Sequence, residues 1–336
     1  MNINNMSDMS MNTRMHLHPN VLLEKELPLS ATRDGFGKGL CAAAEQNSRI
    51  VGVSADLTES TKMTEFAKQF PERFIQVGVA EQNLVTVGSG LAAEGKIPFC
   101  AAFAAFSPGR NWEQIRTTVC YNDQPVKIVG SHAGLTVGPD GATHQMLEDL
   151  ALMRVLPNMK VVVPADALQA AKATLALAQD SYPAYLRVAR EKSPVFTTTE
   201  TPFLLGKADV YWKGSDVTVV ACGPLVYMAL QAAYALRHIL SVEVINVHTI
   251  KPLDVLTILR SVRKTRCLVS VEEHQIAAGL GSAVPEALVQ RFPVAMEFIG
   301  VHDQFGESGQ AKELWKKFNI TAPFIISKIK KVCKRK

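Results

Sequence analysis

A single carboxylate, Glu81, stands between an apolar run, FIQVGV (74–79), and a stretch with helical periodicity that is rich in small residues. A carboxylate at a helix start can simply complement the positive end of the helix dipole. The apolar surroundings suggest a second role, because burial favours the protonated form of a carboxyl group. A protonated carboxyl can donate a hydrogen bond to a ring nitrogen. From this residue alone, both interpretations remain open.

A glycine-rich stretch, SHAGLTVGPDGATHQ (131–145), carries His132, Asp140 and His144. Zinc ligands usually come in closely spaced pairs, and no third strong ligand is near such a pair in this stretch. We therefore expect no metal site formed by this chain. Two imidazoles and a carboxylate on a bent loop are better suited to hydrogen-bonding the hydroxyls of a sugar, and histidines can move protons between substrate oxygens.

Arg33, Ser60 and Arg190 are far apart in the sequence, but each lies beside the end of a predicted strand or helix. Arginine is well suited to binding phosphate through paired hydrogen bonds, although surface arginines are common. Phe103 and Phe106 follow the apolar run PFCAAF (98–103) and could share one face. Core packing is the ordinary explanation for such a pair, and a stacking platform for a planar ring is the alternative.

The elements that must position these side chains alternate between strand and helix from residue 30 onward. Short β-branched runs separated by helical stretches are typical of parallel sheets covered by helices. The alternation stops in the polar, Thr-rich stretch EKSPVFTTTETPF (191–203) and then resumes. We therefore predict two successive doubly wound α/β domains with mainly parallel sheets, at residues 24–192 and 206–336, joined by a linker at 193–205. In parallel sheets ligands gather at the carboxyl ends of the strands.

Composition excludes several other classes of protein. The 336-residue chain has a net charge of +5, but its last nine residues, KIKKVCKRK, carry six positive charges, which leaves −1 for the rest. A nucleic-acid surface is therefore not expected, and no apolar run is long enough to cross a membrane. The six cysteines show no CxxC spacing, which indicates reduced thiols in a cytoplasmic protein. Residues 1–23 are predicted to be a disordered N-terminal segment.

Taken together, the motifs SADLTES (54–60), VAEQN (79–83), GPDGATHQ (138–145) and LRVAR (186–190) resemble the pyrimidine-binding and C-terminal domains of transketolases. The resemblance covers about residues 24–336. Transketolases are thiamine diphosphate enzymes that transfer a two-carbon ketol unit from a ketose phosphate to an aldose phosphate.

The resemblance implies a role for each candidate residue. Glu81 would bind N1′ of the cofactor's aminopyrimidine ring and promote its imino tautomer, Phe103 and Phe106 would wall that ring, and Asp56 would approach the cofactor near a subunit interface. The sugar phosphate would be held by Arg33, Ser60, Arg190 and His132, and its hydroxyls by Asp140 and His144. His132 and His144 would join Glu81 as catalytic residues. Gly109 departs from the family pattern, since many relatives carry another aromatic there.

No GDG segment followed by a metal-binding asparagine occurs in the sequence, although the family uses one to hold the diphosphate through Mg²⁺ or Ca²⁺. The resemblance therefore implies the C-terminal subunit of a split transketolase. Such a chain would self-associate and act only with an N-terminal partner subunit, in an α2β2 heteromer, on phosphosugar substrates of the pentose phosphate pathway. Alternatives are a β-type subunit of a 2-oxo acid dehydrogenase E1 component, a deoxyxylulose phosphate synthase-like subunit, or a non-catalytic scaffolding subunit.

Overall fold

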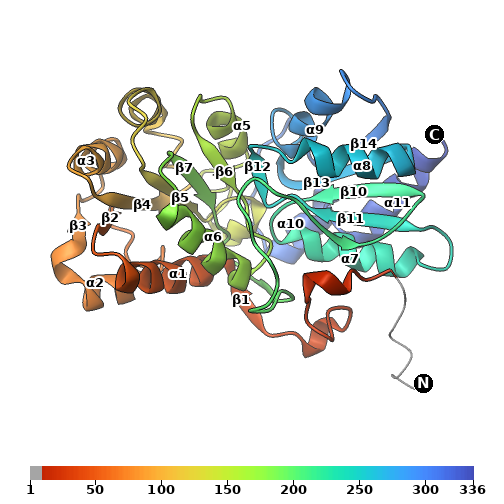
Figure 1. The fold of residues 1–336 in the computed structure, drawn as a ribbon, viewed down its shortest axis with the longest axis horizontal. Coiled ribbons are helices and arrows are strands. Elements are labelled where there is room, and N and C mark those ends of the chain that lie inside the picture. Colours follow the sequence, from red (N-terminus) through yellow and green to blue (C-terminus); the bar gives the residue numbers. More distant parts are fainter. Residues whose placement is uncertain (1–9) are drawn as a thin grey trace.

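The computed structural model describes residues 10–336. Figure 1 shows two α/β units side by side along the long axis of the molecule. Six strands of the first unit run parallel in one sheet, as the sequence pattern predicts. They are β2 (Ile50–Ser54), β3 (Phe74–Gln76), β4 (Ile97–Phe103), β5 (Lys127–Ser131), β6 (Lys160–Val162) and β7 (Ala184–Arg187).

Helices cover both faces of this sheet. The core of one face packs beneath α1 (Thr32–Gln46), α2 (Thr64–Gln69) and α6 (Ala167–Gln179). The other face lies against α3 (Glu81–Ala93), α4 (Trp112–Gln114), the π-helical segment η5 (Ile115–Tyr121) and α5 (Asp149–Arg154). Helices α1 and α6 touch closely at Gly35, where a Cβ would lie 1.9 Å from the Ala167 carbonyl oxygen. This contact requires glycine.

The second unit is a five-stranded sheet in the order β14-β13-β10-β11-β9. The sequence pattern anticipates its parallel strands β10 (Val217–Ala221), β11 (Val242–Asn246), β13 (Cys267–Gln275) and β14 (Ala295–Val301), but not the antiparallel edge strand β9 (Asp209–Trp212). The sheet packs with α7 (Leu225–Leu236), α8 (Val255–Thr265), α9 (Leu280–Leu288), α10 (Ala311–Lys317) and α11 (Ala322–Cys333). The prediction of two mainly parallel α/β domains is confirmed.

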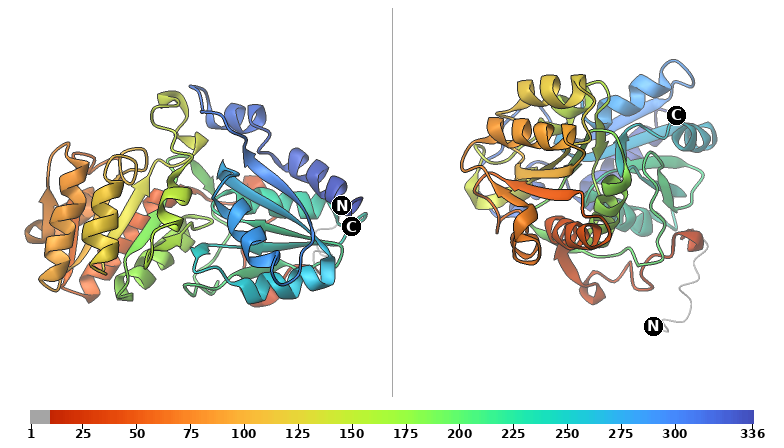
Figure 2. Two further views of the ribbon diagram at one scale, coloured as in Figure 1. Left: turned by 90° about the horizontal axis from the view of Figure 1, so that it is seen from above. Right: turned by 60° about the vertical axis from the view of Figure 1, so that its left-hand side comes forward.

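The two units share structure as well as a chain connection. Strand β12 (Thr249–Lys251) belongs by sequence to the second unit, yet it pairs antiparallel with β6 and forms the edge of the first sheet, whose order is β12-β6-β7-β5-β4-β2-β3. One hydrophobic core also runs between the units, joining Val161 and Val163 to Ile245 and Val247. The left view of Figure 2 shows the two units side by side from above.

The chain around the predicted linker is well packed. Strand β1 (Leu29–Ala31) pairs antiparallel with β8 (Lys192–Pro194) at the start of that segment. The backbone N–H groups of Phe196 and Thr197 then donate to the buried carboxylate of Asp166. These bonds attach the connection to the N-terminal end of α6.

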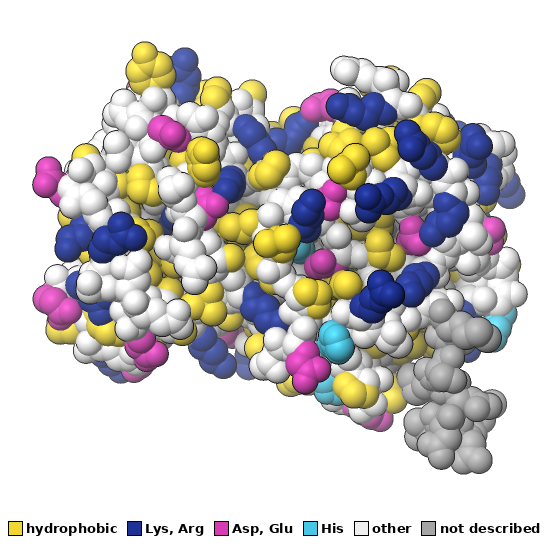
Figure 3. Space-filling view, in the orientation of Figure 1, with side chains coloured by type: hydrophobic (Ala, Val, Ile, Leu, Met, Phe, Trp, Pro, Cys, Tyr) yellow, Lys and Arg dark blue, Asp and Glu magenta, His cyan; other side chains and the backbone are white. Residues whose placement is uncertain are grey.

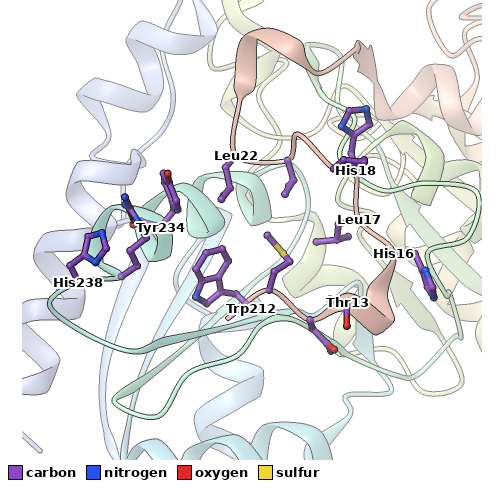
Figure 4. A pocket seen from close by; sticks show the side chains of 13 residues that line it. Thr13, His16, Leu17, His18, Leu22, Trp212, Tyr234 and His238 are labelled. Carbon is purple, nitrogen blue, oxygen red and sulfur yellow. Dashed lines mark hydrogen bonds between the residues drawn. The ribbon is translucent and has the colours of Figure 1, made fainter. Parts of the chain in front are cut away.

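The predicted disorder of residues 1–23 needs correction. Residues 1–9 lie outside the described residues, but residues 10–23 are placed against the second unit. The Asn12 N–H donates to Tyr211 O at 3.0 Å, Met11 bridges to Trp212, and Val21 is buried. Apolar residues within this polar segment bury surface on the second unit, which favours order. The segment helps to line a cavity of about 380 Å³ with Trp212 and Tyr234 (Figure 4), separate from the candidate site below.

Basic side chains gather on the second unit in Figure 3, and the basic tail ends α11. Part of this charge is used within the fold, because Lys328, Lys331 and Arg335 all pair with Glu297 on β14. Burial opposes the ionised form, but these cations lower the pKa of Glu297 to about 2. All six cysteines are unpaired. Within residues 10–336, no helix has the length and hydrophobicity of a membrane span.

Candidate active site

Glu81 is the first residue of α3, and only 1% of its surface is exposed. The loop before it turns at Gly78, whose φ is +69°. Arg110 Nη1 donates to Glu81 Oε2 at 2.6 Å, and Asn111 Nδ2 donates to the Glu81 carbonyl oxygen at 2.7 Å. Burial is as expected, but the partner is a cation. In this chain Glu81 therefore accepts from a charged group, which differs from the neutral, donating carboxyl that its apolar setting suggests.

Phe103 and Phe106 form one ring cluster at the carboxyl end of β4. Their centroids are 6.0 Å apart with the planes tilted by only 22°. The His132 ring stacks on Phe103 with centroids 3.9 Å apart. The rings of His144 and Phe106 form an edge-to-face contact with centroids 5.4 Å apart. The two phenylalanines therefore share a face, and both loop histidines lie against them.

Four of the predicted site residues come together beside this ring cluster, namely Arg33, Ser60, His132 and Arg190. Arg33 Nη1 donates to Ser60 O at 2.9 Å and lies 3.3 Å from His132 Nε2. Arg33 Nε is buried without a hydrogen-bond partner among residues 10–336. Burial lowers the pKa of the Arg33 guanidinium, and the nearby positive charge of Arg190 lowers it further, against the opposing effect of Asp34. Like charges held together around an unused donor are suited to an anion, so we call these four residues the candidate anion site.

His132 is an uncharged member of this site. Burial and the positive charges of Arg33 and Arg190 lower the pKa of His132 to about 3. Its Nδ1 lies 2.9 Å from Ser131 Oγ, which fixes the ring. The catalytic role that the resemblance implies for His132 stays a prediction, and with this lowered pKa the ring would act from its neutral form. Hydrogen bonding by a neutral imidazole fits the geometry.

Lys62 is a residue that the sequence did not single out. It contributes to the lowered pKa of His132, so its charge acts on the anion site, and its Nζ lies 3.5 Å from Asp34 Oδ1. Its backbone packs tightly on α1, where a Cβ at Gly37 would lie 2.5 Å from Lys62 O. In the sequence, Lys62 could have been found as a candidate by its position two residues after Ser60.

The loop that carries Asp140 and His144 is bent by glycines at positive φ, namely Gly134, Gly138 and Gly141. Arg190 Nη1 donates to Val137 O at 2.6 Å and approaches Asp140 Oδ1 at 3.4 Å. Asp140 thus lies at the anion site, whereas His144 lies at the ring cluster.

Residues of the second unit hold this loop in place by hydrogen bonds. Glu273 Oε1 accepts from the Thr136 N–H at 2.7 Å, and Gln145 Nε2 donates to Glu307 O at 2.9 Å. Buried Arg187 donates to Met146 O and Glu273 O, and it pairs with Asp149. Burial raises the pKa of Glu273 to about 7, although Arg187 opposes this. The second unit therefore contacts the candidate site through the stretches VEEH (271–274) and GVHDQFGESG (300–309).

Asp56 follows β2 in a left-handed backbone conformation, with φ of 59°. Its backbone N–H donates to Gln76 Oε1 at 2.7 Å, and the residue is exposed. The structure does not join Asp56 to the ring cluster by any contact between described residues. Likewise, no group of three or more His, Cys, Asp or Glu side chains suited to a metal ion occurs within the described part of the chain.

The fold defines a class of α/β protein with mainly parallel sheets, in which the arginines and His132 lie beside aromatic rings. Comparison with families of known proteins identifies this class. The transketolase pyrimidine-binding domain matches residues 30–195, and the transketolase C-terminal domain matches residues 206–325. The chain belongs to the transketolase family.

Similar proteins include separately encoded transketolase sections. A putative transketolase C-terminal section from Methanocaldococcus jannaschii is 39% identical over 90% of this chain and 96% of its own length. The 6-deoxy-6-sulfo-D-fructose transketolase subunit SqwH from a Clostridium species is 40% identical over 90% of this chain and 95% of its own length. A solved structure described as a split gene transketolase, inactive beta4 tetramer, is 42% identical, with a TM-score of 0.85 over 90% of this chain and 98% of that one.

Proposed function

We propose that this chain is the C-terminal subunit of a split, thiamine diphosphate-dependent transketolase. It transfers a two-carbon ketol unit from a ketose phosphate to an aldose phosphate, and it acts in the cytoplasm together with an N-terminal partner subunit. The observation that carries the proposal is the position of His132. Its Nε2 lies 3.3 Å from Arg33 Nη1 at the candidate anion site, and its ring stacks on Phe103 in the ring cluster. A substrate with an anionic end is thereby directed toward the site of a planar ring.

The residues present fit the aminopyrimidine half of the cofactor. Glu81 offers a buried carboxylate with only Oε2 engaged by Arg110, and the face of Phe106 lies beside the same guanidinium. When bound, thiamine diphosphate supplies a carbanion equivalent and an electron sink. Glu81 would bind the ring nitrogen, Phe103 and Phe106 would wall the ring, and exposed Asp56 would lie toward the partner.

The diphosphate and its Mg²⁺ or Ca²⁺ are assigned to the partner subunit. The similarity to relatives named as a C-terminal section and as a subunit, covered over 96% and 95% of their own lengths, supports this assignment. We propose an α2β2 heteromer that contains a dimer of this chain. Xylulose 5-phosphate and ribose 5-phosphate are the first substrates to test, and a sulfonated sugar is the second, because one relative is named for 6-deoxy-6-sulfo-D-fructose.

The test is a ketol-transfer assay with both sugar phosphates, thiamine diphosphate and Mg²⁺. The chain is assayed alone and with its N-terminal subunit, as wild type and as Glu81→Ala. Glu94→Ala, at the exposed other end of α3, is the matched control. Activity only in the mixture, lost in Glu81→Ala and kept in Glu94→Ala, supports the proposal. Activity of the chain alone contradicts the split assignment, and a cofactor-loaded complex without turnover on phosphorylated or sulfonated sugars contradicts the assigned reaction.

A further inference from the structure

Two of the six free thiols meet where the end of α11 packs against β13. Cys267 is the first residue of β13 and is fully buried, whereas Cys333 is the last residue of α11 and is half-buried. The Cys267 thiol donates a hydrogen bond to the Cys333 sulfur. The two cysteines are far apart in the sequence, so tertiary packing brings their sulfur atoms together.

The chain at the end of α11 is held against the same strands by further contacts. Arg335 Nη1 donates to Met296 O at 3.0 Å, and Met296 follows the residue of β14 that pairs with Cys267. Lys336 Nζ and Cys267 Sγ both donate to Asp216 O, at 3.3 Å and 3.4 Å. These contacts fix the end of α11 over the start of β13, so the contact between the two thiols is part of the fold.

We propose that Cys267 and Cys333 form an oxidative modification site, at which a low-molecular-weight disulfide converts the two thiols into an intrachain disulfide. The Cys333 thiolate attacks one sulfur of the small disulfide, which releases one small thiol and leaves a mixed disulfide on Cys333. The Cys267 thiolate then attacks the Cys333 sulfur and releases the second small thiol. The protein loses two hydrogen atoms, and the small disulfide is reduced to two thiols. This inference does not depend on the proposed function.

The order of the two steps follows from exposure and from the neighbouring charges. Burial raises the pKa of the Cys333 thiol, as does the Asp216 carboxylate, but the hydrogen bond from Cys267 and the charge of Lys336 oppose this. Burial, followed by the neighbouring Cys333, raises the pKa of the Cys267 thiol to about 12. The more exposed Cys333 therefore reacts first. Exchange should become faster as pH rises above neutrality, because the thiolate is the attacking species.

The test treats the reduced, folded whole chain with glutathione disulfide at pH 8. Wild type is compared with Cys267→Ser, Cys333→Ser and Cys41→Ser. Cys41 is the matched control, because it is also half-buried but lies beside the carboxylates of Glu45 and Glu65. The remaining thiols are then alkylated, and the unreduced chain is digested with trypsin. The melting temperatures of the oxidised and reduced chains are measured in parallel.

Oxidised wild type should yield one product in which the tryptic peptide 267–291 is joined to the peptide 332–334, and reduction should separate the two. Cys333→Ser should leave Cys267 reduced, whereas Cys267→Ser should stop at a mixed disulfide between Cys333 and glutathione. Cys41→Ser should form the same cross-link as wild type. Oxidised wild type should melt about 3–8 °C above its reduced form, since a bond that closes a long loop restricts the unfolded chain.

If the buried serine prevents folding, Cys267→Ala decides by the same readouts. Thiols at Cys267 and Cys333 that both remain open to alkylation after treatment of the folded wild type overturn the inference. Glutathione added equally at Cys41 and Cys333 without a cross-link also overturns it, because the second thiol then plays no part. A cross-linked chain that melts no higher than the reduced chain shows that the bond distorts the native contact, and this too overturns the inference.

Discussion

Replacing Arg33 by glutamine should impair the use of phosphorylated sugars selectively. Arg33 Nη1 is engaged with Ser60 O and His132, but the buried Nε has no partner among residues 10–336 and is available to an anion. Glutamine removes the charge and the fork of donors. A hydrogen bond to a charged group contributes about 1.5–3 kcal/mol, which corresponds to about a 10- to 150-fold change in kcat/KM.

The assay compares ribose 5-phosphate with ribose as acceptors in the assembled enzyme. We expect Arg33→Gln to lower kcat/KM for ribose 5-phosphate by this factor. For ribose, which carries no phosphate, kcat/KM should change little. Lys38→Gln is the control, because it removes a positive charge from an exposed position on the same helix, α1. Equal losses with both acceptors would show that Arg33 acts by holding Ser60 and His132 in place, and would refute its role as an anion ligand.

Three further predictions concern the same region. The His132 ring, with its pKa lowered to about 3 by burial and the arginines, should not titrate between pH 5 and 8 in NMR spectra of the unliganded chain, and a midpoint in that window would contradict the anion site. Lys62→Met should lower kcat/KM for ribose 5-phosphate by about three- to tenfold because a nearby charge is lost, and an equal loss for ribose would exclude this role. Glu273 has its pKa raised to about 7 by burial, so its stabilising contribution is complete below its unfolded value near 4.5 and is lost as pH rises through 7. Glu273→Gln should therefore reduce the fall in Tm between pH 5 and pH 8, with a free-energy change of up to about 3 kcal/mol, and an unaltered pH slope would refute this assignment.

The sequence predicted the parallel strands because their signal is local. The apolar runs at β2, β4, β5 and β7 are bounded by polar residues, and the candidate side chains follow these runs directly. Once the strands are parallel, their carboxyl ends meet at one edge, which brings His132 beside Arg33 and Phe103. Glu81 at a helix start follows from the same pattern.

Pairings between distant segments could not be predicted in this way. Strand β12 has only three residues, and its pairing with β6 depends on a register set by tertiary packing. The Glu81–Arg110 pair depends on a tight turn at Gly109, where a Cβ would lie 2.1 Å from Ala105 O, and hydrophobic periodicity does not reveal such a turn. The N-terminal segment looks disordered by composition, because its few apolar residues gain burial only when the second unit is present.

The contacts of the loop that carries Asp140 and His144 give the second unit a part in the candidate site, although the second unit contributes no predicted ligand. The loop has glycines at three positions with positive φ, which gives its backbone little intrinsic preference for one conformation. Glu273 binds it at Thr136, and the Glu307 carbonyl accepts from Gln145, so both anchors come from beyond the linker. Strand β12 and the shared core keep those anchors at a fixed distance from β5. The C-terminal domain therefore positions Asp140 and His144 by fixing the backbone at Thr136 and Gln145, on either side of them. A pyrimidine-binding domain expressed without the C-terminal domain should lose that loop geometry even if its own sheet folds.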